Sequence, residues 1–169
     1  MSCVLLIFHR IPPVAWAAVS CGLTFGVLLW AFWRSHRGIV AFYFDPQDFV
    51  AYERGGGREL PVAAAAGVFE PQLRNYIDVT KLLITVAAAS IAFGGGQTPS
   101  KGILGAKIFL AFAVLYGVAF CALLQFFYDE YCQNVRAYTR LRYSLIEALG
   151  FSTLVCFIGG YFVWAFNLG

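Results

Sequence analysis

The sequence predicts an all-α integral membrane protein with four transmembrane helices. Hydrophobic residues make up 60% of the 169 residues and charged residues only 12%, whereas soluble domains contain about 25% charged residues. The mean hydropathy is +0.72, and several uncharged stretches reach the roughly 20 residues that cross a bilayer. We expect four spans, a short N-terminal interfacial arm, and a cytoplasmic loop of about forty residues between the first two helices.

Three of the spans follow directly from long uncharged stretches. Residues 14–33 form the first, residues 103–128 the third, whose uncharged part begins at Ile108, and residues 148–168 the fourth. The arm, residues 1–13, precedes the first span and ends in two prolines, which do not continue a helix beyond its first turn.

The second span, expected at residues 71–96, is less obvious. Its uncharged part, Leu82–Gly96, has only fifteen residues. A helix that begins near Pro71 and reaches Gly94 would be about 36 Å long. It would cross the bilayer and project into the cytoplasm, with Asp78 and Lys81 at the level of the headgroups.

The two segments between spans on the cytoplasmic side have their own patterns. In the loop 34–70, the apolar stretch 38–44 predicts a short strand or an interfacial segment. Asp45-Pro46 is typical of a helix start and predicts a short helix that Gly55 ends. The segment 129–147 contains neither Gly nor Pro, and we expect it to extend the third helix into the cytoplasm.

Lysine and arginine are distributed unevenly between the two sides of this four-span topology. Segments 34–81 and 129–147 contain nine of them, and the rest of the chain contains three. Because these residues favour cytoplasmic loops, we expect both termini outside and both segments in the cytoplasm. The expected location is the inner (plasma) membrane.

No motif for catalysis or for a cofactor is present, and we expect the protein not to be an enzyme. His9 and His36 fall on opposite sides of the membrane in this topology, and the five cysteines show no ligand spacing. We therefore expect no metal and no cofactor. The small net charge of +3 is spread along the chain, which argues against nucleic acid. The partners expected are the lipid bilayer and either further copies of the chain or other membrane subunits.

The second span has one small, weakly polar face. At 100° per residue, seven residues of this face fall within about 100° of arc. In lipid such a face should meet protein or water, so it predicts either close helix packing or the lining of a pore. Its residues are Asp78, Lys81, Thr85, Ala88, Ala89, Ala92 and Gly96.

Two smaller groups of candidate residues complete the prediction. Gly22 and Gly26 have the spacing of small residues at helix contacts, and Gln125 suits a hydrogen bond between helices. A second group either binds a phosphate-bearing messenger or lipid headgroup, or simply enforces topology at the headgroups. That second group consists of Arg136, Arg140, Arg142 and Tyr143.

Four helices of this size leave little room for a conduit within one chain. The leading hypothesis is therefore a small homo-oligomeric membrane protein, either a gated pore or a membrane-disrupting effector. Bacterial defence systems are one setting for such effectors, although no motif indicates it. The alternative is a non-catalytic accessory or assembly subunit of a larger membrane complex, and a lipid-modifying enzyme is a third, weaker possibility.

Overall fold

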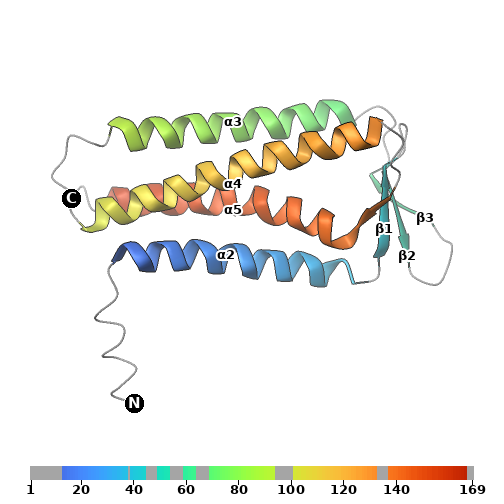
Figure 1. The fold of residues 1–169 in the computed structure, drawn as a ribbon, viewed down its shortest axis with the longest axis horizontal. Helices are drawn as coiled ribbons and strands as arrows, with labels where there is room; N and C mark the ends of the chain where they lie inside the picture. The colour runs from blue at the N-terminus through green and yellow to red at the C-terminus, as the bar shows by residue number, and fades with distance from the viewer. Residues whose placement is uncertain are drawn as a thin grey trace, which may run out of the picture.

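Four long helices lie side by side, and a small sheet lies at one end of them (Figure 1). The computed structural model describes residues 13–37, 39–44, 49–53, 59–63, 69–93, 101–132 and 137–166. Each long helix is long and apolar enough to cross a membrane, so the prediction of four helices of this length and composition is confirmed. The helices are α2 (Pro13–Ser35), α3 (Phe69–Phe93), α4 (Lys101–Cys132) and α5 (Arg140–Phe166).

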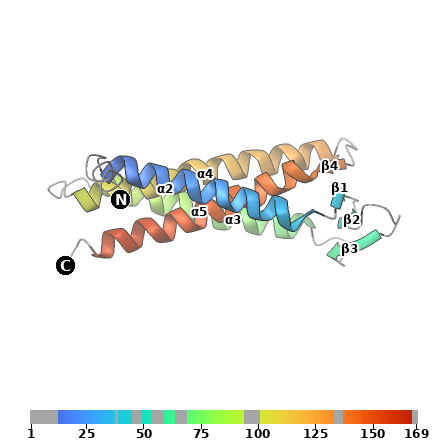
Figure 2. The ribbon, with the colours of Figure 1, turned by 90° about the horizontal axis from the view of Figure 1, so that it is seen from below.

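Helices α4 and α5 form the central pair of the bundle. Helix α2 packs against both of them, and α3 packs mainly against α4 from the opposite side. Figure 1 shows α2 and α3 at the two edges of the bundle, and Figure 2 shows the four helices from a perpendicular direction. The two edge helices consequently have faces that no other described helix of the chain covers.

The contact between α4 and α5 depends on small residues. Every fourth residue of one α5 face is small and buried, with exposed fractions of no more than 9%. At Gly160 a Cβ atom would lie 2.9 Å from the Leu110 side chain, closer than real contacts allow, so only glycine permits this approach. Small interface residues bring helix backbones together where lipid provides no hydrophobic driving force. The five residues are Ser144, Ala148, Ser152, Cys156 and Gly160.

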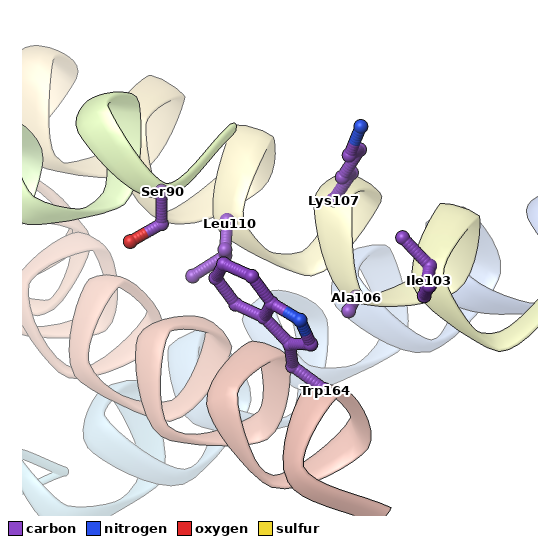
Figure 3. Close-up of a pocket in the computed structure, with 6 residues that line it drawn as sticks. All are labelled: Ser90, Ile103, Ala106, Lys107, Leu110 and Trp164. Atoms are coloured by element: carbon purple, nitrogen blue, oxygen red, sulfur yellow. The ribbon is translucent and has the colours of Figure 1, made fainter. Parts of the chain in front are cut away.

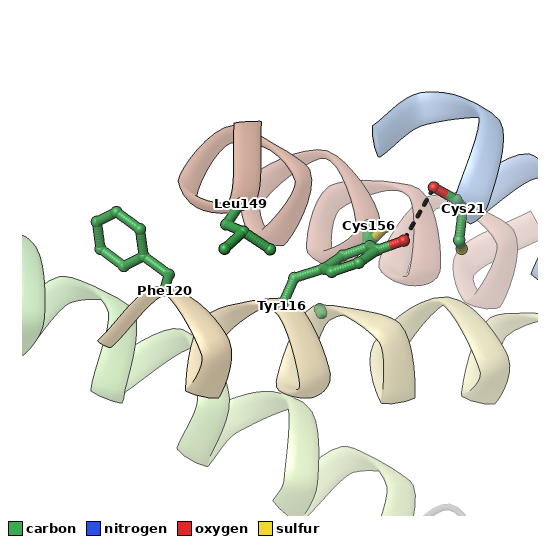
Figure 4. Packing of buried hydrophobic residues seen from close by; sticks show 6 residues of the cluster. Cys21, Tyr116, Phe120, Leu149 and Cys156 are labelled. Atoms are coloured by element: carbon green, nitrogen blue, oxygen red, sulfur yellow. Dashed lines mark hydrogen bonds between the residues drawn. The ribbon is translucent and has the colours of Figure 1, made fainter. Parts of the chain in front are cut away.

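Aromatic and small apolar side chains fill the contact of α2 with the central pair. The Tyr116 hydroxyl of α4 donates a hydrogen bond to the Cys21 carbonyl of α2 (3.2 Å), as Figure 4 shows. The Tyr116 ring also stacks on Phe25, with 5.5 Å between ring centroids. Cys156 of α5 is buried in the same cluster, so α2, α4 and α5 share one core.

The outer surface of the bundle is strongly apolar. Large hydrophobic side chains are exposed on all four helices, including Leu23 on α2, Leu82 on α3, Leu115 on α4 and Phe162 on α5. In water such a surface would be an aggregation hazard, whereas in a bilayer it contacts acyl chains. The structure thus agrees with a multi-pass membrane protein.

The sheet is antiparallel, with strand order β3-β2-β1-β4. Its strands are β1 (Ile39–Phe44), β2 (Phe49–Glu53), β3 (Glu59–Ala63) and β4 (Ala137–Thr139). Strand β1 follows α2 closely and β4 immediately precedes α5, and the two strands pair with each other. The sheet therefore ties the end of α2 to the start of α5.

The predictions for the segments outside the spans are only partly correct. Phe49–Glu53 is a strand and not part of a short helix, because it pairs with β1 on one side and β3 on the other. The strand alternative for residues 38–44 is confirmed by β1. The expected extension of the third helix past residue 128 is present but short: α4 ends at Cys132, and the segment 129–147 also contains β4 and the start of α5 at Arg140. The pairing of β4 with β1 provides backbone hydrogen bonds that a continuous helix would exclude.

The boundaries of the spans also differ in part from the prediction. Helix α5 begins eight residues before the expected residue 148 and so includes Glu147. Helix α3 begins at Phe69, close to the expected start at Pro71. Residues 1–12 of the expected N-terminal arm, the proposed helix start at residues 45–48, and Gly94–Gly96 lie outside the described residues.

Candidate functional site

One contact shows how α3, α4 and α5 are placed relative to one another along the bundle axis. A Cβ atom at Gly117 of α4 would lie 2.8 Å from Ile84 Cγ1 of α3 and 3.2 Å from Thr153 Cγ2 of α5. Asp78 of α3 lies six residues before Ile84, and Glu147 of α5 lies six residues before Thr153. At 1.5 Å per residue, each is about 9 Å closer to the sheet than this contact. These two carboxylates therefore lie at one depth, at the sheet end of the bundle.

The small face of α3 points away from the other described helices. Its members Asp78, Lys81, Thr85, Ala88 and Ala92 are exposed, and Ala89 is half-buried. Gly96, the seventh member, lies outside the described residues.

The opposite side of α3 makes the contact with α4. Thr80 and Ala87 are buried there, and Ile84 meets Gly117. No described helix of this chain covers the small face, which the sequence predicts to meet protein or water.

The polar groups of α3 are largely satisfied within the helix itself. The Thr85 hydroxyl donates to the Lys81 carbonyl (2.8 Å) and the Thr80 hydroxyl to the Tyr76 carbonyl (2.7 Å). Asp78 and Lys81 form no ion pair among the described residues. The outward face thus offers two charges near the sheet end and small, weakly polar side chains beyond them.

A second polar cluster lies where α2 ends and α5 begins. His36 Nε2, in the turn after α2, donates a hydrogen bond to Glu147 Oε2 of α5 over 2.7 Å. The edge of the His36 ring meets the Tyr143 ring, with 5.4 Å between centroids.

Arg140 joins the same two helices. Its guanidinium donates to the Trp33 carbonyl and stacks over the Trp33 ring at 4.5 Å. We call His36, Glu147, Tyr143, Arg140 and Trp33 the α2–α5 junction.

The predicted arginine group is only partly brought together. Arg140 is half-buried in the junction, whereas Arg142 is exposed on α5 and lies 5.8 Å from the Phe127 ring of α4. Tyr143 packs on His36, and Arg136 lies outside the described residues. The described members are thus engaged with aromatic rings and a backbone carbonyl, as expected of arginines at a membrane boundary.

The residues proposed for helix packing lie on the outside of the bundle. Gly22 and Gly26 are exposed, and a Cβ atom at either would meet nothing within 4 Å. Gln125 is exposed on α4. Close helix approach in this chain occurs instead at Gly117 and Gly160.

Sequence reasoning did not find the His36–Glu147 pair. The two residues are 111 positions apart, and only the three-dimensional arrangement brings them together. The sequence does contain one hint that Glu147 has a specific partner. It is the one acidic residue after Glu130, and the helix continues with apolar residues beyond it. The sequence predicts a span that begins at Ala148, which places Glu147 just outside it.

Neither a metal centre nor a ligand cavity is found in the part of the chain that the structure describes. Those residues contain no group of three or more His, Cys, Asp or Glu side chains placed to hold a metal ion. A hollow of about 10 Å³ between α3, α4 and α5 has room for about one water molecule. Figure 3 shows Trp164 beside Leu110 and Ala106, with the Lys107 amine pointing away. The surface that faces this hollow is apolar, although Ser90 and Lys107 are among its lining residues.

Comparison of the chain with protein-family models, with curated proteins and with solved structures finds no match.

Proposed function

We propose that the protein is a small homo-oligomeric membrane protein in which α3 helices of several copies surround a narrow path. The observation that carries this proposal is the outward orientation of the small face of α3. A continuous face of small, weakly polar residues gains little from contact with acyl chains. Asp78 and Lys81, at its headgroup end, favour water or a polar partner, so contact with other copies around a water-filled path suits both parts of the face.

A path within a single chain fits the packing poorly. The small residues of α5 bring its backbone close to α4, and the space beside Gly117 and Gly160 is too small even for a Cβ atom. The hollow beside Trp164 holds about one water molecule. A conduit formed by the described helices would therefore have to lie between copies.

The order of residues along the face suits a gated pore. Asp78 and Lys81 would form rings of charge near the sheet end, and Ala88 and Ala92 would form an apolar constriction farther in. Charged rings select ions, and apolar constrictions close by losing water. The sheet, which is joined directly to α2 and α5, would be the sensing side. A membrane-disrupting effector, as in bacterial defence, would use the same pore, and opening of the pore would harm the cell.

The competing function is a non-catalytic accessory or assembly subunit. The same α3 face would then pack on a different membrane protein, and no conduction would occur. The exposed pair Gly22 and Gly26 on α2 favours this alternative in one respect, because it offers a second face for close helix approach.

Liposome currents together with oligomer mass separate the two functions. Purified protein should form a homo-oligomer in mild detergent and conduct in liposomes. Ala88→Trp and Ala92→Trp should each reduce conductance at least about tenfold, because the indole fills the constriction, without loss of the oligomer.

Ala111→Trp is the matched control, since Ala111 is an exposed alanine of α4. It should leave conductance unchanged. A monomer that does not conduct, or currents that persist in both α3 variants, would exclude the α3 pore.

A further inference from the structure

Asp78 and Lys81 of α3 have no ionic partner in the part of the chain that the structure describes. Both side chains are exposed, and the ion pair formed among the described residues joins His36 to Glu147. Arg74, one turn closer to the sheet, has an interaction of its own. Two opposite charges near the sheet end of α3 are therefore available to a partner outside this chain.

Helix geometry places these two charges on opposite flanks of the small face. Residues three apart in an α-helix differ by about 60° around the axis and by about 4.5 Å along it. The directions of Thr85 and Ala92 lie between those of Asp78 and Lys81. At the sheet end, one flank of the face is thus acidic and the other flank is basic.

A second copy of the same chain presents charges that complement this arrangement. Copies related by rotation about the membrane normal keep the same depth, so the acidic flank of each α3 meets the basic flank of the next. Lys81 lies three residues deeper than Asp78, but the Cα–Cβ bonds of a helix tilt toward its N-terminus. In α3 the N-terminus is at the sheet end (Figure 1). The flexible lysine stem can therefore reach the level of a neighbouring Asp78.

We propose that Asp78 of each copy forms an ion pair with Lys81 of the next copy, so that a second copy of the chain is the partner of this surface. The inference rests on the proposed function, in which α3 helices of several copies surround a path. That arrangement brings the Asp78 carboxylates close to one another, and the Lys81 amines as well, and like charges repel. Pairing between copies offsets both repulsions and fixes the register in which the α3 helices meet.

An ion pair within one helix is the competing arrangement for the same two residues. Opposite charges three residues apart can pair along a helix surface, but the structure contains no such pair between Asp78 and Lys81. The two arrangements respond differently when variants are mixed. A pair within one helix is not restored by adding a different copy, whereas a pair between copies is.

Charge reversal in separately tagged copies tests the pairing. In mild detergent, Asp78→Lys and Lys81→Asp should each raise the dissociation constant of the homo-oligomer at least about tenfold, because like charges then face each other at every contact. A mixture of the two variants should associate within about threefold of the wild type, since each contact between unlike copies again joins a carboxylate to an amine. Co-purification of one variant through the tag of the other measures the mixed assembly.

Arg34→Glu is the matched control, because it reverses an exposed charge on α2, at the opposite edge of the bundle. It should leave the dissociation constant within about threefold of the wild type. The chain that carries both Asp78→Lys and Lys81→Asp should associate like the wild type, which reports that the substituted α3 still folds.

Three results would overturn the ion pair while the proposed function stands. They are single reversals that leave the oligomer intact, a mixture that associates no better than either variant alone, and an equal loss in Arg34→Glu. A wild type that is monomeric at all concentrations would overturn the proposed function and the ion pair together.

Discussion

The molecule has two helix faces made of small residues, and they have opposite environments. The face of α5 from Ser144 to Gly160 is buried against the bundle. The face of α3 from Asp78 to Ala92 is open. Both have the spacing that lets helix backbones approach closely, yet the chain itself uses only one of them.

The difference between the two faces is their charge. The α5 face contains two hydroxyls, a thiol, a methyl group and a glycine, none of which is charged. The α3 face contains Asp78 and Lys81, whose burial inside a single bundle would carry a desolvation cost. Small residues alone therefore do not predict which face a chain covers, and charge at one end identifies the face that is left for water or for another subunit.

The largest expected effect comes from filling the covered face. Gly160→Leu should lower the free energy of unfolding by roughly 2–3 kcal/mol, because even a Cβ atom would lie 2.9 Å from Leu110 and 3.3 Å from the Ala106 carbonyl. Denaturant titration in mixed micelles measures this loss. The matched variant Gly22→Leu fills open space on α2 and should leave stability unchanged or raise it by up to about 1 kcal/mol, because leucine is the better helix former. Equal losses in the two variants would contradict the packing described for α5.

A smaller increase in side-chain size, from alanine to valine, compares the α5 and α3 faces directly. Ala148→Val should cost roughly 1–2 kcal/mol, since Ala148 is fully buried and the added methyl groups overpack the contact. Ala88→Val, on the open face of α3, should leave the unfolding free energy of the monomer within about 0.5 kcal/mol of wild type. Comparable destabilisation by both would mean that the α3 face is covered within the chain.

The smallest effect is expected at Ser152. Its hydroxyl is fully buried and has no hydrogen-bond partner among the described residues. Ser152→Ala removes an unsatisfied polar group, so stability should stay unchanged or rise by up to about 1 kcal/mol. A loss above about 1 kcal/mol in the same titration would show that the hydroxyl has a partner.

Much of the helical architecture could be predicted from local sequence. Uncharged stretches of sufficient length predict the first, third and fourth spans, and the predicted start near Pro71 lies two residues from the observed start of α3 at Phe69. Hydropathy succeeds here because a spanning helix satisfies its backbone internally and needs no partner to be recognised.

The sheet and the junction could not be predicted in the same way. Phe49–Glu53 follows an acid and a proline that resemble a helix start, and only pairing with β1 and β3 decides for a strand. Ala41 and Thr139 pair across most of the chain, as do His36 and Glu147. Contacts at such separations leave no local periodicity to detect.

The central claim is that the α3 face meets other copies of the same chain, and cross-linking tests it most directly. Ala88→Cys in native membranes, treated with a mild thiol oxidant, should give disulfide-linked dimers. The wild type, which reports on the native cysteines, should not, and neither should Ala111→Cys on the exposed side of α4. Dimers from Ala88→Cys alone are the result that the account predicts. Cross-linking of Ala88→Cys no greater than that of the wild type would contradict it.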